Sequence, residues 1–259
     1  MATQFIEGLA VETAGEGSPV VCIHGLGGSS NSFSPLMKAL LGYRVVRIDL
    51  PGSARSGSGS GELSIDSMVE AVRKVLQRLG IGNARLIGHS MGSIVCQHLA
   101  HRHPSLVKSM LLFGPLACPP EAARPNIAAR AKKAADGGMV AMAEIADAIV
   151  EGATARSTRE ENPVAIALIR ESLMRQDPQG YARCCTALAN SQSAPLEEIS
   201  IPVWLVTGDE DAVAPAESVR IMGRRLPNAR VDILRRCGHW TMMEKPDECA
   251  ALLREFIRH

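Results

Sequence analysis

The pentapeptide G-H-S-M-G at residues 88–92 decides the fold of this chain. It follows a short apolar run at 84–87 and precedes a helix-like stretch at 93–100. A serine between two glycines, placed between a strand and a helix, is the pattern of a nucleophile elbow. The turn is so sharp that bulky flanking residues do not fit, and the helix N-terminus favours negative charge beside Ser90. Because the pattern alone is common by chance, the interpretation depends on the rest of the chain.

The chain around this turn alternates between strand-like and helix-like segments. Strand-like runs occur at 20–23, 43–49, 84–87, 106–113, 203–207 and 230–234. Helical periodicity occurs at 34–41, 65–79, 93–100, 216–226 and 246–257. This alternation predicts an α/β fold with a parallel sheet and helices on both faces. The Gly/Ser-rich stretch at 51–61 is predicted to be a flexible, solvated loop within the domain.

The alternation stops between residues 116 and 198. Apolar residues there recur at helical spacing, as in Met139, Met142, Ile145 and Ile149, and again in Ile166, Ile169 and Leu173. Four breaks divide the region into three or four helices: Gly137-Gly138, Gly152, Asn162-Pro163 and Asp177-Pro178. We therefore expect residues 1–115 and 199–259 to form an α/β core, with residues 116–198 as a helical cap inserted into it.

The composition limits the partners that the protein can have. Lys and Arg number 28 against 27 Asp and Glu in 259 residues, so a net charge of +1 offers no attraction to nucleic acid or an anionic membrane. No apolar run approaches the ~20 residues that span a bilayer, and the N-terminus lacks the pattern of a secretory signal. Seven cysteines without C-x-x-C spacing suit free thiols in a reducing compartment. We expect a cytoplasmic monomer or homodimer.

A serine nucleophile needs a general base, which a third group must orient. His239 lies in the loop after the last strand-like run and is the histidine best placed for that role. The three histidines near residue 100 have no carboxylate or cysteine at metal-binding spacing. We expect structural hydrogen-bonding roles for His24 and His89, which lie inside tight loops. We expect His98, His101 and His103 to lie at a solvated helix end, and His259 is the last residue of the sequence.

The orienting acid is expected at a strand end between the serine and the histidine. The segment G-D-E-D-A-V-A-P at 208–215 offers three carboxylates, and its spacing selects Asp211. Asp209 and Glu210 are expected to be exposed turn residues. The end of the preceding strand-like run, at 113–115, contains no acid.

Acyl transfer also requires N–H donors directed at the developing oxyanion. The elbow supplies the backbone N–H of Met91. The glycine-rich segment H-G-L-G at 24–27 ends the first core strand at the same sheet edge, and its Leu26 is the expected second donor.

Five motifs together resemble the α/β-hydrolase superfamily over nearly the whole chain. They are H-G-L-G-G at 24–28, D-L-P-G and R-S within 49–56, G-H-S-M-G at 88–92, G-D-E-D-A-V-A-P at 208–215 and G-H-W at 238–240. The order serine, aspartate, histidine is also that of the superfamily. The resemblance implies an eight-stranded, mostly parallel sheet flanked by helices, with the cap inserted after the sixth strand. One departure is S-A-R-S at 53–56, where many relatives have a glycine in place of Ala54.

Within the superfamily the chain looks most like small carboxylesterases and 3-oxoadipate enol-lactonases, the latter through the cap segment at 177–188. We expect an acyl-enzyme mechanism on a small-molecule ester or lactone, with Ser90, His239 and Asp211 as catalytic residues and no cofactor or metal. The alternatives are an enol-lactone hydrolase of aromatic degradation, a perhydrolase or carbon–carbon bond hydrolase with the same triad, and a non-catalytic ligand-binding homologue. Five cap cations are candidates for a substrate carboxylate, although a solvated surface position is the simpler expectation for each: Arg130, Lys133, Arg170, Arg175 and Arg183.

A dinucleotide-binding enzyme is a rival of a different class. Gly25, Gly27 and Ser30 follow a strand, and Asp49 ends the next strand at nearly the spacing of a dinucleotide fingerprint. The third glycine is missing, however, and this interpretation gives Asp211 and His239 no role.

Overall fold

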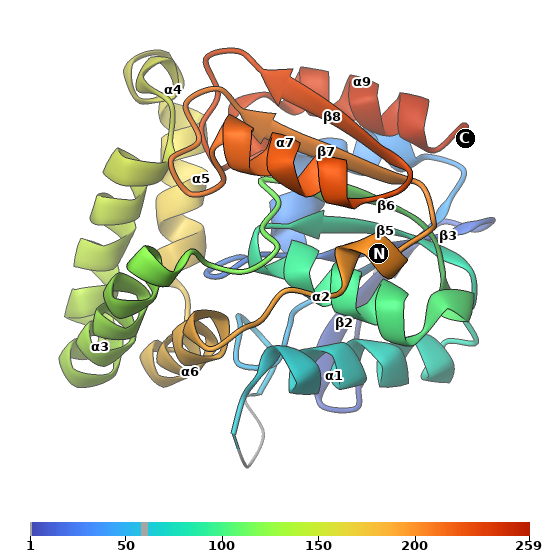
Figure 1. Ribbon diagram of the computed structural model, residues 1–259. Helices are drawn as coiled ribbons and strands as arrows, with labels where there is room; N and C mark the ends of the chain where they lie inside the picture. The colour runs from blue at the N-terminus through green and yellow to red at the C-terminus, as the bar shows by residue number, and fades with distance from the viewer. Residues whose placement is uncertain (1, 58–61) are drawn as a thin grey trace.

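The computed structural model describes residues 2–57 and 62–259 and confirms the predicted α/β architecture (Figure 1). Its eight strands form one sheet in the order β1-β2-β4-β3-β5-β6-β7-β8. The pairs β1–β2 and β2–β4 are antiparallel, and all other pairs are parallel. The strands are β1 Ala2–Ile6, β2 Leu9–Ala14, β3 Pro19–Ile23, β4 Arg44–Ile48, β5 Ala84–His89, β6 Val107–Phe113, β7 Val203–Gly208 and β8 Ala229–Leu234.

Helices cover both faces of this sheet because the central strands are apolar on both sides. In β6, Met110 and Leu112 face one hydrophobic cluster, whereas Leu111 and Phe113 face the other. The first cluster is completed by α1 (Ile65–Arg78), α2 (Met91–Arg102) and α7 (Ala216–Arg225), and the second by η1 (Ser30–Leu40) and α9 (Pro246–Phe256). The segment at 34–41, predicted as a helix, belongs to η1, a 3-10 helix that contains Pro35.

The parallel strands end at one sheet edge, and this edge collects the predicted site residues. Ser90 follows β5 directly, Asp211 comes three residues after β7, and His239 comes five residues after β8. The H-G-L-G segment follows β3 at the same edge. Residues from four distant parts of the sequence therefore come together at one edge of the sheet.

Four helices between β6 and β7 form an insertion at one side of the sheet (Figure 1), and we call them the cap. They are α3 Arg124–Ala153, α4 Arg156–Glu161, α5 Pro163–Met174 and α6 Pro178–Ala189. The glycine pair at 137–138 kinks α3 instead of ending it, since Gly138 alone has non-helical backbone angles. Met142 and Ile145 are buried as predicted, but Met139 is 60% exposed, so it does not belong to the apolar stripe.

Two features of the N-terminal part differ from what the sequence predicts. The strands β1 and β2 carry no strong apolar pattern and were not expected from periodicity. The loop after β4 is not solvated throughout, because Pro51, Ser53 and Ser56 are buried, and the Ser56 hydroxyl accepts from Ala10 N–H at 2.9 Å. Residues 58–61 of the predicted loop lie outside the described residues. A search of the described helices finds none with the length and apolarity that a membrane crossing requires.

The close approach of α2 to the end of β3 yields a first prediction. A Cβ atom added at Gly92 would lie 2.1 Å from the carbonyl oxygen of Ile23 and 2.5 Å from that of His24. We expect Gly92→Ala to lower the free energy of unfolding by more than about 3 kcal/mol in urea denaturation, since backbone must move.

Gly152→Ala is the matched control, because a Cβ atom at Gly152 in α3 meets no described atom within 4 Å. It should leave stability unchanged or raise it by up to about 1 kcal/mol. Equal stability of the two variants would contradict the close contact at Gly92.

Candidate active site

The backbone at Ser90 is held in an unfavourable conformation at the turn between β5 and α2. Its angles are φ 51° and ψ −121°, in a region that non-glycine residues rarely adopt. Two hydrogen bonds hold the turn: Ser90 N–H donates to the Phe113 carbonyl at 3.0 Å, and the Ser93 hydroxyl donates to the Ser90 carbonyl at 2.6 Å. The result is a serine side chain at the sheet edge, 7% exposed and with a fixed direction.

The structure brings together the three side chains that the sequence singles out for the triad. His239 Nε2 lies 2.8 Å from Ser90 Oγ, and His239 Nδ1 lies 2.9 Å from Asp211 Oδ2. Gly114, with φ +50°, packs against the His239 ring, since a Cβ atom there would lie 2.9 Å from it. With Nδ1–H donating to Asp211, Nε2 is free to accept the Ser90 proton, as a general base must.

The Asp211 carboxylate remains ionised although the residue is buried, with only 4% of its surface exposed. Burial on its own raises the pKa of the Asp211 carboxyl, but His239, the Ala214 N–H and the Thr207 hydroxyl lower it to about 2. The Ala214 N–H and the Thr207 hydroxyl donate at 2.7 and 2.8 Å. Asp209 and Glu210, the other two carboxylates of the segment, are exposed, as predicted.

Two backbone amides have no acceptor among the described residues, and they are the two predicted for the oxyanion site. Met91 is the first residue of α2, so its N–H has no intrahelical partner. The Leu26 N–H makes no hydrogen bond within the described residues, and Leu26 lines the cavity above Ser90. The cap holds this loop, since Ser172 Oγ and Gln176 Nε2 donate to the Gly27 carbonyl at 2.8 and 3.2 Å.

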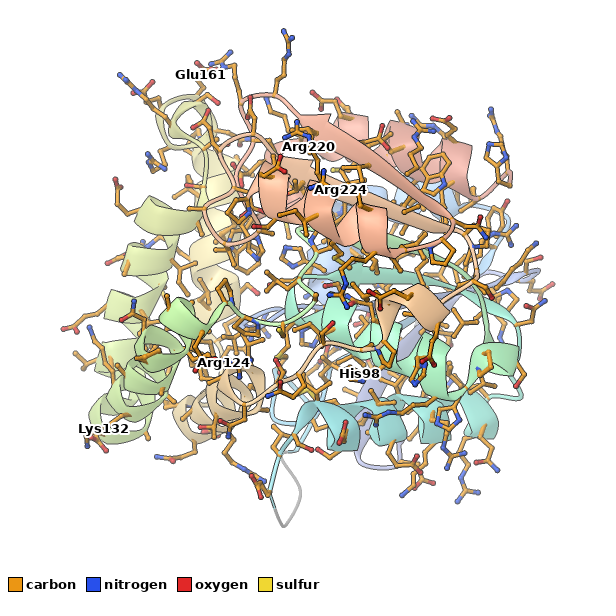
Figure 2. The ribbon with its side chains drawn as sticks, in the orientation of Figure 1. His98, Arg124, Lys132, Glu161, Arg220 and Arg224 are labelled. Atoms are coloured by element: carbon orange, nitrogen blue, oxygen red, sulfur yellow. The ribbon has the colours of Figure 1, made fainter. Side chains whose placement is uncertain are left out.

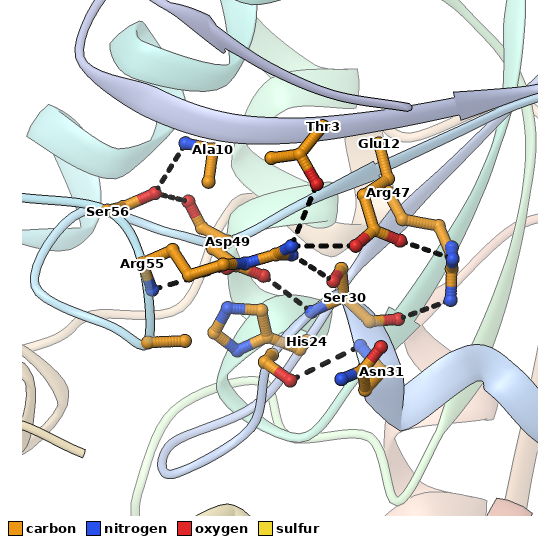
Figure 3. A network of polar contacts seen from close by, with 12 residues as sticks. Thr3, Ala10, Glu12, His24, Ser30, Asn31, Arg47, Asp49, Arg55 and Ser56 are labelled. Carbon is orange, nitrogen blue, oxygen red and sulfur yellow. Dashed lines mark hydrogen bonds and ion pairs between the residues drawn. The ribbon is translucent and has the colours of Figure 1, made fainter. Parts of the chain in front are cut away.

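A buried polar network supports the far end of the same loop (Figure 3). Asp49 Oδ1 accepts from Ser30 N–H at 2.7 Å, and its Oδ2 accepts from Arg55 Nε at 2.8 Å. Glu12 then joins Arg55 to Arg47, which also donates to the Ser30 carbonyl at 3.1 Å. Burial raises the pKa of Asp49, but the Arg55 hydrogen bond and neighbouring groups outweigh it, so the pKa is lowered and the carboxylate stays charged.

The Asp49 carboxylate is therefore fully buried, and its oxygens already accept hydrogen bonds from the chain. Both facts argue against a dinucleotide-binding site. That alternative needs an acid that reaches a ribose hydroxyl. Here the carboxylate is 0% exposed and bonded to the chain itself.

Two further histidines have the structural roles predicted for them. His24 Nε2 accepts from Leu50 N–H at 2.9 Å. His89 Nε2 donates to the His239 carbonyl at 3.0 Å, which joins the turn at Ser90 to the backbone of His239. Burial, reinforced by His239, lowers the pKa of His89 to about 3, so this ring is neutral.

Among the described residues, no group of three or more His, Cys, Asp or Glu side chains is arranged to hold a metal ion.

Glu244 supports the site but was not identified from the sequence. Its Oε2 accepts from Ala155 N–H and Thr158 Oγ1 of the cap, both at 2.8 Å, and from Gly238 N–H at 3.0 Å. Its Oε1 accepts from Trp240 N–H at 3.0 Å. One buried carboxylate thus joins both flanks of His239 to the start of α4. The sequence offers no signal for this role, because the partners are up to 89 residues away.

A cavity of about 340 Å³ lies between the cap and the sheet edge, and Ser90, His239 and Leu26 line its floor. Its walls are mostly apolar, with Leu116, Ile127, Ile149, Leu188 and Val213 among the lining residues. Of the five candidate cap cations, Arg130 alone lines this cavity. The expectation of a purely solvated surface position is therefore wrong for Arg130.

Comparison with known proteins gives a family and several relatives. A family model described as the alpha/beta hydrolase fold matches residues 18–246. A thermophilic esterase from Thermogutta terrifontis, solved with malate bound, is 25% identical to this chain, with a TM-score of 0.91. The aligned region covers 99% of this chain and 97% of the esterase chain. The enol-lactonase from Burkholderia xenovorans LB400 is 26% identical with a TM-score of 0.89, and both chains are fully covered. A 2-hydroxy-6-oxononadienedioate/2-hydroxy-6-oxononatrienedioate hydrolase from Burkholderia vietnamiensis is 27% identical to this chain. The aligned region covers 92% of this chain and 86% of that hydrolase.

The four hydrogen bonds of Glu244 predict the effect of an isosteric change. All four partners are donors, so the NH₂ group of Glu244→Gln would face N–H or O–H groups. We expect a loss of about 2–4 kcal/mol in the free energy of unfolding, measured in urea. Glu248→Gln, at an exposed position on α9, should change it by less than about 0.5 kcal/mol. Similar values for both variants would show that the Glu244 contacts contribute little.

The low pKa of Asp211 predicts a specific dependence of stability on pH. Its pKa is lowered from the usual 3.8 to about 2 in the folded protein, so ionised Asp211 stabilises the fold above about pH 4. This contribution is lost as pH falls towards 2. The stability difference between wild type and Asp211→Asn should shrink by about 2 kcal/mol between pH 5 and pH 2. Urea denaturation followed by circular dichroism measures it. A difference that stays constant with pH would contradict the role of Asp211 charge.

Proposed function

The chain belongs to the α/β-hydrolase fold family, and from this premise we propose that it is a serine hydrolase that cleaves a carboxylic ester or lactone of a small molecule. The observation that carries the proposal is the continuous contact from Asp211 through His239 to Ser90, with distances of 2.9 and 2.8 Å. This contact lies beneath a mostly apolar cavity of about 340 Å³, a size suited to a small molecule.

In the proposed reaction, His239 Nε2 takes the proton of Ser90 as Oγ attacks the substrate carbonyl. Asp211 holds the Nδ1–H tautomer and stabilises the imidazolium that forms. The free N–H groups of Leu26 and Met91 receive the oxyanion. The imidazolium then protonates the leaving alcohol, and a water molecule, activated by the same histidine, hydrolyses the acyl-enzyme.

Two of the structural relatives make an ester or a lactone a reasonable substrate for this proposal. An esterase and an enol-lactonase align with nearly the whole chain at TM-scores of 0.91 and 0.89. Hydrolysis of an ester and of a lactone needs the same steps. The alcohol of an ester leaves, whereas the alcohol of a lactone stays attached to the acyl group. Enol-lactone hydrolysis is the narrower candidate, and the similarity of the cap segment at 177–188 favours it.

Two substitutions test the nucleophile. We expect Ser90→Ala to lower kcat/KM for short p-nitrophenyl esters by a factor of at least about 10⁴, because the attacking oxygen is lost. Ser105→Ala, at an exposed position before β6, should keep the wild-type rate. A panel of esters and lactones of graded acyl length then defines the preferred class.

Labelling gives an independent readout. A serine-directed organophosphate should modify the wild type at Ser90, as located by peptide mass spectrometry, and should leave Ser90→Ala unmodified. If no ester or lactone is hydrolysed and no label is taken up, the serine-hydrolase proposal is wrong.

A further inference from the structure

Arg130 is the one residue with a full positive charge among the described residues that line the cavity, and no Asp or Glu side chain accompanies it there. It lies on the same face of α3 as Ile127, one turn earlier, and both residues line the cavity. Many charged side chains of the protein point outwards, as Lys132 and Glu161 do in Figure 2. A lone guanidinium at the wall of an apolar cavity is therefore unusual here.

The other four candidate cations of the cap already have partners. Lys133 pairs with Glu144, and Arg170 pairs with Asp147, at 2.8 and 2.7 Å. Arg175 lies 3.7 Å from Glu171 on the same helix. Arg183 also interacts with a neighbouring group.

Arg130, in contrast, makes no ion pair with any described residue. Its Nε atom is buried and has no hydrogen-bond acceptor within the described chain. Elsewhere the Arg130 side chain is hydrogen-bonded to the Cys185 thiol, and the Tyr181 hydroxyl is close enough to feel its charge. Burial raises the pKa of both groups, which the Arg130 charge opposes, so both stay neutral and neither can balance that charge.

A guanidinium without a counter-ion, whose Nε atom is buried, has a physical cost that a bound anion would remove. Buried polar atoms are normally satisfied, and a charge without a counter-ion is poorly stabilised away from water. Carboxylate is the anion whose geometry matches the planar guanidinium, with which it forms paired, charge-assisted hydrogen bonds. The apolar wall that Ile127 and Leu116 form suits a run of methylene groups.

We propose that the substrate is an anionic ester or lactone whose acyl chain ends in a carboxylate, and that Arg130 binds this carboxylate. The inference rests on the proposed function for the reaction at Ser90. It goes beyond that function by naming the charge of the substrate and the residue that selects it. Arg130 then determines specificity and takes no part in bond cleavage.

Two esters of equal chain length test the proposal: p-nitrophenyl hydrogen adipate, which ends in a carboxylate, and p-nitrophenyl hexanoate, which ends in a methyl group. The preference is the ratio of their kcat/KM values, each corrected for the rate with Ser90→Ala. We expect the wild type to prefer the adipate ester, and Arg130→Gln to lower the preference by ten- to a hundredfold. Arg130→Lys, which keeps the charge, should restore part of it.

Arg170→Gln is the matched control, because Arg170 is a partly exposed cap arginine paired with Asp147. It should keep the wild-type preference. The proposal is overturned if the wild type prefers the hexanoate ester, if Arg130→Gln keeps the wild-type ratio, or if Arg170→Gln lowers the ratio as much as Arg130→Gln does.

A binding measurement separates failure of the subsite from failure of the proposed function. Monomethyl adipate should bind to Ser90→Ala in isothermal titration calorimetry at least tenfold more tightly than to the double variant Ser90→Ala/Arg130→Gln. If this difference is found but no ester is hydrolysed, the carboxylate site stands and the hydrolase proposal fails. If esters are hydrolysed but the two variants bind the probe equally, the hydrolase proposal stands and the carboxylate site is refuted.

Discussion

The contact between the first turn of α2 and the end of β3 is the constraint on which the site depends. Gly92 lets the helix approach the carbonyl oxygens of Ile23 and His24 to a distance that no side chain would allow. The same contact fixes two things at once, the direction of Ser90 at the start of the helix and the position of the loop that carries Leu26. The proposed nucleophile and the expected oxyanion donors are therefore set relative to each other by backbone packing alone.

His239, the proposed base, is held in a different way, through the cap. The His239 N–H donates to the Ala153 carbonyl at 2.9 Å, and Glu244 joins the residues on either side of His239 to the start of α4. The cap also holds the Leu26 loop through Ser172 and Gln176. It therefore does more than cover the cavity, because it also orders two of the loops on which the chemistry would depend.

The sequence predicts much of this arrangement because its signals are local. A short motif marks each strand end at the active edge, so Ser90, Asp211 and His239 can be identified without coordinates. The strandless stretch after β6 likewise predicts the cap.

What the sequence does not predict depends on contacts between distant residues. Glu244 looks like an ordinary helix residue, since its acceptor role appears only when α4 packs against the His239 loop. Arg130 cannot be told from Lys133 by spacing alone, because the course of α3 decides which of them meets the cavity. The burial of the loop after β4 is hidden for the same reason, as its Gly/Ser composition does not show that Ser56 binds the backbone of β2.

Gly114 restricts where an acid beside His239 can lie. The parallel strands β6 and β7 are neighbours in the sheet, and Gly114 directly follows β6. A side chain at Gly114 would collide with the His239 ring, since even a Cβ atom would lie 2.9 Å from it. An acid at that position would therefore require His239 to move away from Ser90. The observed contact between His239 and Ser90 is thus compatible with an acid after β7, where Asp211 lies, and not with one at Gly114.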